Sequence, residues 1–162
     1  MTLIEEIKKI IKSEKLDIDL NLTDEKLIIE FKDKVNWYEI SYHKKLSENF
    51  IIEFKDKVDW WEISYHQKLS EKFIREFKDK VDWYEISYHQ KLSESFIIEF
   101  KDKVYWYGIR HNENIKISNR FLVEIYKLGN EKAFYELKQK TELKEYAIKI
   151  EEEVLVLFLE IV

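Results

Sequence analysis

Hydrophobic residues recur through the middle of this chain at the spacing of an α-helix. Within residues 69–81 the apolar side chains fall on one stripe of a helix with 3.6 residues per turn. They are Leu69, Phe73, Ile74, Phe77 and Val81. Ser70 is placed as an N-cap residue, and the helix dipole favours the acidic Glu71 in the first turn. The pattern predicts a short amphipathic helix with one buried side.

A second helix is predicted directly after the first. It begins at Asp82, and Glu85 three residues later completes the pattern of a capping box. Trp83 and Ile86 are expected to point inward one turn apart. Glu85, Tyr88 and His89 are expected to point away. Because EISYH and FIIEF alternate polar and apolar residues in places, a strand interpretation stays open beside the helical one.

The same phrase occurs four times along the chain. FKDKV begins at Phe31, Phe54, Phe77 and Phe100, always 23 residues apart, and a tryptophan follows in step at 37, 60, 83 and 106. Fixed-period repetition indicates a stacked array in which each unit buries its apolar side against its neighbours. We therefore predict an all-α tandem-repeat α-solenoid of short antiparallel helix pairs over residues 23–107, with the repeated tryptophans in its core.

The segments on both sides of the array differ from the repeat. Residues 1–22 combine an amphipathic helix pattern with an alternation at 16–22 that is typical of a strand. Residues 108–162 begin at Gly108, where the other copies have glutamate, and include a diverged fifth copy, SNRFLVEIYKLGNEKAF, two residues out of phase. We predict non-repeat caps at both ends. Residues 142–162 fit either a capping helix or a β-hairpin, for which 16–22 is the natural third strand.

Composition restricts the class of protein further. The chain has 162 residues, no cysteine and no proline, and a net charge of −5. This length fits one hydrophobic core. Without cysteine, a zinc site depends on histidine and carboxylate ligands. The start lacks a signal-peptide pattern, and the longest apolar run, VLVLFL, is too short to cross a membrane. We therefore expect a cytoplasmic protein without a membrane partner.

The words DWYEIS, LSE-x-FI and EFKDKV resemble the short tandem repeats of uncharacterised proteins from giant viruses and some large phages. The resemblance covers residues 23–107 and does not reach the termini. That family has no established activity or ligand, so the resemblance implies no catalytic residue. It implies a viral or mobile-element origin, the host cytoplasm as the location, and action against host machinery such as a CRISPR-type defence complex.

The residue pattern does not predict catalysis or a metal centre. His43, His66 and His89 form a column with one histidine per repeat. Neighbouring helices stand about 8–10 Å apart, whereas zinc ligands lie within about 2.1 Å of one ion, so this column is not expected to bind a metal. The carboxylates also repeat in every copy between lysines, as on a solvated surface. In the second copy they are Glu53, Asp56, Asp59 and Glu62. We expect no enzyme activity, no cofactor and no small-molecule substrate.

Nucleic-acid binding is not favoured by the charges of the repeats. Residues 46–68 contain five acidic and three basic residues, for a net charge of −2, and residues 69–91 contain five of each. A protein that binds strands needs a basic track to displace counterions from phosphates. Direct binding is therefore not expected, and mimicry of nucleic acid by the acidic surfaces stays an alternative.

Two rows of equivalent positions are the candidate partner-binding residues. On a helical wheel Arg75 lies almost opposite the centre of the apolar stripe, so the aliphatic residues at the same position of other copies are expected to be exposed. This ridge consists of Ile29, Ile52, Arg75, Ile98 and Val123. The second row consists of Tyr42, Tyr65 and Tyr88, beside His43, His66 and His89. Packing against neighbouring segments is an equally open interpretation of both rows.

These observations together predict a non-enzymatic helical-repeat module that binds a protein partner. Tyrosine at regular intervals on a rigid scaffold is favourable contact material. A self-assembling structural repeat protein, in which the ridge pairs with itself to form a homo-oligomer, is the alternative. A nucleic-acid-binding or nucleic-acid-mimicking protein comes third.

Overall fold

The chain folds as an all-α tandem-repeat solenoid. The structure is a computed structural model and describes residues 5, 9, 24–43 and 45–139. Within these ranges there are helices and no strand, so the helical prediction for EISYH and FIIEF is confirmed and the strand alternative is wrong there. The segments predicted at 16–22 and 142–162 lie outside the described residues.

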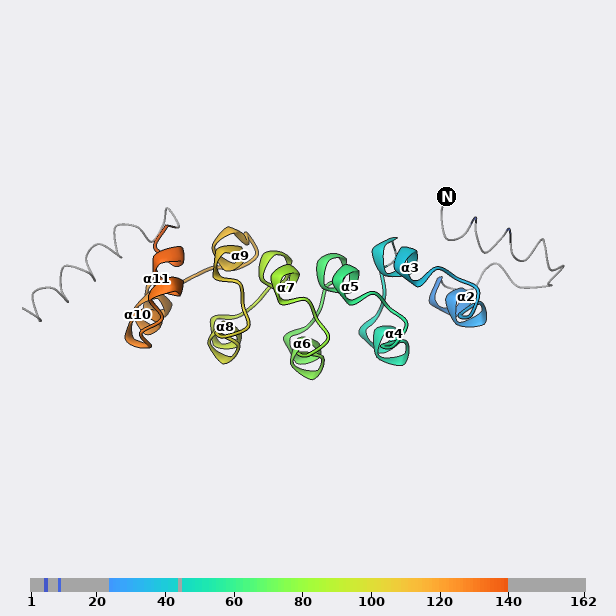
Figure 1. The fold of residues 1–162 in the computed structure, drawn as a ribbon, viewed down its shortest axis with the longest axis horizontal. Coiled ribbons are helices and arrows are strands. Elements are labelled where there is room, and N and C mark those ends of the chain that lie inside the picture. Colours follow the sequence, from blue (N-terminus) through green and yellow to red (C-terminus); the bar gives the residue numbers. More distant parts are fainter. Residues whose placement is uncertain (1–4, 6–8, 10–23, 44, 140–162) are drawn as a thin grey trace, which may run out of the picture. The chain divides into compact units, whose positions relative to one another are not determined.

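The chain divides into two units, Met1–Val81 and Asp82–Val162, and each is described by itself. In unit 1, the helices that begin at a tryptophan (B helices) form one row and the helices before them (A helices) form the other (Figure 1). The B helices α3 and α5 contact each other directly. The described helices of unit 1 are α2 (Asp24–Glu30), α3 (Trp37–His43), α4 (Glu48–Glu53), α5 (Trp60–His66) and α6 (Glu71–Glu76).

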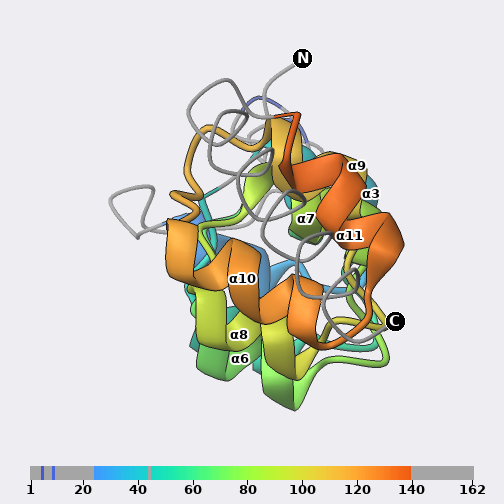
Figure 2. The same cartoon turned by 90° about the vertical axis from the view of Figure 1, so that its left-hand side faces the viewer.

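Unit 2 continues the alternation of A and B helices and then changes. The B helix α9 contacts both α7 and α11, and α10 and α11 lie side by side (Figure 2). Gly129 joins α10 to α11 in a left-handed conformation, with φ at 67°, which a residue without a Cβ adopts easily. The described helices of unit 2 are α7 (Trp83–His89), α8 (Glu94–Glu99), α9 (Trp106–His111), α10 (Asn119–Lys127) and α11 (Glu131–Leu137).

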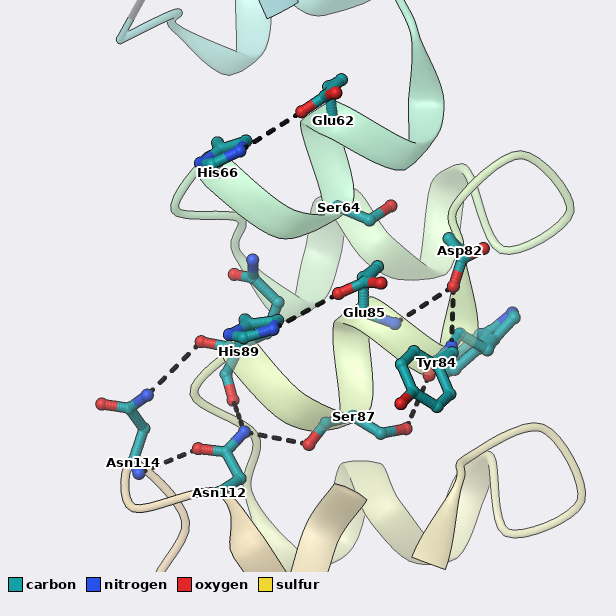
Figure 3. A network of polar contacts seen from close by, with 12 residues as sticks. Glu62, Ser64, His66, Asp82, Tyr84, Glu85, Ser87, His89, Asn112 and Asn114 are labelled. Atoms are coloured by element: carbon teal, nitrogen blue, oxygen red, sulfur yellow. Dashed lines mark hydrogen bonds and ion pairs between the residues drawn. The ribbon is translucent and has the colours of Figure 1, made fainter. Parts of the chain in front are cut away.

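Local hydrogen bonds set where the helices begin. The hydroxyl of Ser70 accepts the backbone N–H of Phe73 at 3.1 Å, which confirms the predicted N-cap of α6. The carboxylate of Asp82 accepts the N–H groups of Tyr84 and Glu85 at 2.9 and 3.1 Å (Figure 3). Such a cap supplies an acceptor for N–H groups that have no partner inside the helix.

In a capping box the glutamate side chain accepts the backbone N–H of the cap residue. In this chain a different side chain accepts that N–H. In α5 the backbone N–H of the cap residue Asp59 donates to the hydroxyl of Ser41 at 3.0 Å. Ser41 lies on the preceding B helix, and its own hydroxyl donates to the carbonyl of Trp37 at 2.8 Å. The capping bond therefore also joins two repeats, and the carboxylate of Glu62 is left for another contact.

A second hydrogen bond joins consecutive A helices. The backbone N–H of Ser70 donates to the Glu48 carboxylate at 2.5 Å. In unit 2 the N–H of Ser118 donates to Glu94 in the same way at 2.6 Å. The shared contact makes α10 the A helix of the diverged fifth copy.

The repeated tryptophans pack between repeats; Trp106 is buried, whereas Trp37, Trp60 and Trp83 are half-buried. The Trp60 ring lies 6.2 Å from that of Phe73 and 5.2 Å from that of Phe77, both belonging to the next A helix. Its indole N–H donates to the carbonyl of Lys55 at 2.9 Å, and the Lys80 ammonium lies 5.9 Å above the ring. The sequence predicts these rings in the core, but Trp60 is only half-buried and packs against the following A helix. An aromatic ring can pack on one face and attract a cation to the other.

Candidate functional site

The B helices place pairs of aromatic side chains on the surface. Residues four apart lie on the same side of a helix, so the words WYEISY and WWEISY present two rings each. In unit 1 these four side chains are between 39% and 52% exposed. We call them the aromatic face of unit 1; they are Tyr38, Tyr42, Trp61 and Tyr65.

A histidine ring lies among the members of this aromatic face. The rings of Tyr38 and Tyr42 stack at 6.5 Å, and those of Trp61 and Tyr65 at 5.5 Å. His66 contacts both pairs, because its ring lies 4.6 Å from that of Tyr42 and 4.3 Å from that of Tyr65. Helices α3 and α5 therefore share one continuous aromatic surface.

A buried carboxylate lies under this surface. Glu62 is 0% exposed, and its Oε2 atom lies 3.2 Å from Nε2 of His66 (Figure 3). Neither the contact with His66 nor the approach of Tyr38 gives a Glu62 oxygen a well-formed hydrogen bond. The Glu62 carboxylate, as a nearby acceptor and negative charge, raises the pKa of the Tyr38 hydroxyl, and the charges of Asp59 and Glu39 add to the effect. The edge of the aromatic face at Tyr38 is therefore surrounded by negative charge.

Unit 2 carries a cluster of four tyrosines. The ring centres of Tyr84 and Tyr88 on α7 lie 4.8 Å apart, and the ring centre of Tyr105 lies 5.1 Å from that of Tyr84 and 6.1 Å from that of Tyr88. Tyr107 on α9 lies 6.4 Å from Tyr88 and 6.1 Å from Tyr105. Desolvation and a hydrogen bond with Tyr84 raise the pKa of Tyr88 to about 12. We call this group the tyrosine cluster of unit 2.

Two departures from the repeat form this cluster. Tyr105 stands where Asp59 and Asp82 cap their helices, and its side chain makes no capping hydrogen bond. Gly108 stands where the other copies have glutamate, and a Cβ added there would lie 3.0 Å from Cδ2 of Tyr88. The fourth copy therefore gives up a cap and a helix-favouring residue, and tyrosine rings occupy the space.

The predicted ridge on the A helices is less uniform than the wheel suggested. Ile29 and Ile52 are 39% and 37% exposed. Arg75 is exposed and forms an ion pair with Glu71 at 3.7 Å. Ile98 and Val123 in unit 2 are half-buried. The ridge therefore offers less apolar surface than the aromatic side of the B helices.

Two histidines of the column each contact a carboxylate on their own helix. His66 pairs with Glu62, and Nε2 of His89 lies 3.3 Å from Glu85 (Figure 3). The side chain of His43 lies outside the described part of the chain. Among the described residues, no group of three or more histidines and carboxylates is placed to hold a metal ion.

The structure corrects a second expectation and adds residues that sequence reasoning missed. Glu62 and Glu85 were expected to face solvent, but both are buried. The flanks of a B helix are covered by its neighbours, whereas the spacing of residues within one helix indicates only its own apolar stripe. The exposed aromatics that sequence reasoning missed are Tyr38, Trp61, Tyr84, Tyr105, Tyr107 and Tyr135. The signal was present for Tyr38, Trp61, Tyr84 and Tyr107, since an aromatic residue follows each repeated tryptophan and recurs or is replaced by histidine four positions later.

Comparison with known proteins gives no relative for this chain. No family model matches it, and no curated protein or solved structure is significantly similar to it. In the part of the chain that the structure describes, the helices are all too short or too polar to pass through a bilayer.

Proposed function

We propose that this chain is a non-enzymatic protein-binding module whose contact surface is the aromatic side of its B helices. The observation that carries the proposal is the exposure of large aromatic side chains at equivalent repeat positions in both units. Tyrosine and tryptophan dominate the binding energy of protein interfaces because they bury much area at little cost in side-chain entropy. A rigid repeat scaffold holds these rings in place before a partner arrives.

The carboxylates on the turns between A and B helices support a structural role rather than acid–base chemistry. Lys57 pairs with Asp33 at 2.8 Å, and Lys80 pairs with Asp56 at 2.9 Å, one repeat apart. These lysines lower the pKa of Asp33 and of Asp56 through hydrogen bonding and charge. A carboxylate held ionised in a repeated ion pair is a poor general acid at neutral pH.

The aromatic side is a better contact surface than the ridge. A partner that covers Trp61 and Tyr65 gains two large rings with polar tips, which suit an interface that is exposed before binding. On the ridge, Ile52 is followed in the next repeat by the charged Arg75, which interrupts the apolar surface. A role against a host defence complex, as the viral resemblance implies, is the finer form of the proposal and rests on that resemblance alone.

Site-specific photo-crosslinking distinguishes the two surfaces. A benzoylphenylalanine in place of Tyr65 or Tyr84 probes the aromatic side, and the same residue in place of Ile52 or Arg75 probes the ridge. After irradiation in lysate of the natural host, we expect protein adducts from the first pair only. Adducts from Ile52 and Arg75 alone would move the interface to the A helices. Adducts from none of the four positions would contradict a protein-binding module.

A further inference from the structure

We propose that the aromatic face of unit 1 binds an arginine side chain of the partner protein beside Tyr38 and Trp61. This inference deepens the proposed function and rests on it. Tyr38 and Trp61 occupy equivalent positions on α3 and α5, one helical turn before Tyr42 and Tyr65. Both are about half exposed, at 52% and 47%. Each ring therefore has exposed surface to offer an incoming group.

The charge around these rings selects a cation. Glu62 lies under the face with 0% exposure, and neither of its carboxylate oxygens has a well-formed hydrogen bond. Asp59 and Glu39 also act on the Tyr38 hydroxyl, so three carboxylates bear on this edge. A buried carboxylate is costly unless a positive charge lies near it. A cation brought by the partner supplies that charge.

The chain already uses this combination of groups elsewhere in unit 1. Nζ of Lys57 lies 5.9 Å over the Trp37 ring and 2.8 Å from Asp33. Nζ of Lys80 lies 5.9 Å over Trp60 and 2.9 Å from Asp56. Ring, cation and carboxylate thus come together at each turn from within the chain. On the aromatic face the rings lie at the surface and the Glu62 carboxylate lies buried beneath them, and the partner would supply the cation.

Arginine fits this face better than lysine does. Its guanidinium is planar and weakly hydrated, so it stacks on aromatic rings while it keeps its charge. One turn further along the same helices, the flat His66 ring already lies between Tyr42 and Tyr65, at 4.6 and 4.3 Å from their rings. An arginine beside Tyr38 and Trp61 would repeat this arrangement at the N-terminal ends of α3 and α5.

The test uses the full chain and two small probes. Nα-acetylarginine amide is titrated while the indole N–H resonance of Trp61 is followed by NMR, with Trp61→Tyr to assign that resonance. Nα-acetylcitrulline amide is the control because it has nearly the same shape without the charge. We expect a saturating shift with the arginine probe and a response at least threefold weaker with the citrulline probe. An equal response to both would overturn the proposal, since the carboxylates would then play no part.

Two variants with the same change in net charge separate the buried carboxylate from bulk charge. Glu62→Gln removes the negative charge beneath the face and keeps the shape of the side chain. Glu53→Gln removes a charge from an exposed position on α4. We expect Glu62→Gln to weaken binding of the arginine probe at least threefold and Glu53→Gln to leave it unchanged; equal effects of the two would contradict the proposal. Far-UV circular dichroism of each variant checks that the helices are retained.

The outcomes of this titration and of the photo-crosslinking are independent. Crosslinks from Tyr65 or Tyr84 without selective binding of the arginine probe would leave the protein-binding module standing and overturn the arginine site. Selective arginine binding without any crosslink would support a cation-binding surface and contradict the protein-binding module.

Discussion

At the scale of single residues, neighbouring positions of the repeat should differ sharply in how much a substitution lowers the free energy of unfolding. Ile51 and Ile52 are neighbours on α4, but Ile51 is fully buried and Ile52 is 37% exposed. The next copy places Ile74 and Arg75 at these two positions, and again the first is buried and the second exposed. The repeat itself therefore shows which substitutions the fold accepts.

Ile52→Arg copies what the third repeat already contains, so the fold should be retained. We expect the free energy of unfolding to change by no more than about 0.5 kcal/mol, measured by urea denaturation. Ile51→Ala is the control and should cost about 2–5 kcal/mol through lost burial and a cavity. Ile98→Arg should cost more than Ile52→Arg, because Ile98 is half-buried. A large loss for Ile52→Arg would show that the ridge packs internally.

Tyr88 should give unit 2 a distinctive loss of stability in alkali. Its pKa is raised from 10.0 to about 12 in the folded chain. Between these values the folded state keeps a proton that the unfolded state has lost, so stability falls as pH rises through this window. Urea denaturation at about pH 9 and about pH 11 should show a steeper loss for the wild type than for Tyr88→Phe, which has no hydroxyl to ionise. Equal slopes would contradict the raised pKa.

At the scale of elements, a side-chain cap marks the start of α4–α8, α10 and α11, whereas α9 has no such cap. Ser70, Asp59 and Ser118 each accept a backbone N–H at the start of their helices. Tyr105 does not, although the N–H of Tyr105 itself still donates to Ser87 at 2.8 Å. Position 105 therefore keeps the bond to the preceding B helix and loses the cap.

Restoring the cap should stabilise α9, and comparison with alanine isolates the effect. Tyr105→Asp and Tyr105→Ala both remove the ring from the tyrosine cluster, but only aspartate can accept the N–H groups of the first turn. We expect the aspartate variant to be more stable than the alanine variant by about 1 kcal/mol in thermal or urea unfolding. If the cluster is a contact surface, both variants should also lose the photo-crosslinks at Tyr84. Equal stability would mean that residue 105 is not positioned as an N-cap.

At the scale of the whole molecule, stability is built from contacts between neighbouring repeats. The hydrogen bonds from Ser70 to Glu48 and from Asp59 to Ser41 each join one copy to the next. Buried Gln67 adds another, since its amide donates to the carbonyl of Ser41 at 3.1 Å and accepts the N–H of Leu46 at 3.0 Å. In an array of this kind each copy depends on its neighbours, so the chain should unfold cooperatively.

A binding module and a self-assembling repeat protein predict different solution behaviour. For the binding module we expect a mainly helical far-UV circular dichroism spectrum, cooperative melting, and a constant monomer mass by light scattering over a hundredfold range of concentration. Self-assembly through the ridge would instead make the mass rise with concentration, and Ile52→Arg would abolish that rise. The same measurement therefore separates the two functions and identifies the surface responsible.

The sequence by itself determined the helices, their caps and the repeat period. These features depend on interactions within a few residues, such as the hydrogen bond from the N–H of Phe73 to Ser70 and the helical spacing of Phe73 and Phe77. The exposed position of Ile52 could be inferred as well, because a repeat that accepts Arg75 reveals which side faces water.

Only the tertiary structure decided which polar residues are buried and where the aromatic rings meet. Glu62 is covered because α3 packs beside α5, and a helical wheel of one element does not contain its neighbours. The tyrosine cluster likewise depends on Gly108 of α9 lying against Tyr88 of α7, twenty residues earlier in the chain. Local hydrogen bonds depend on residues that are close together in the sequence, whereas burial depends on surfaces that come together only when the helices stack.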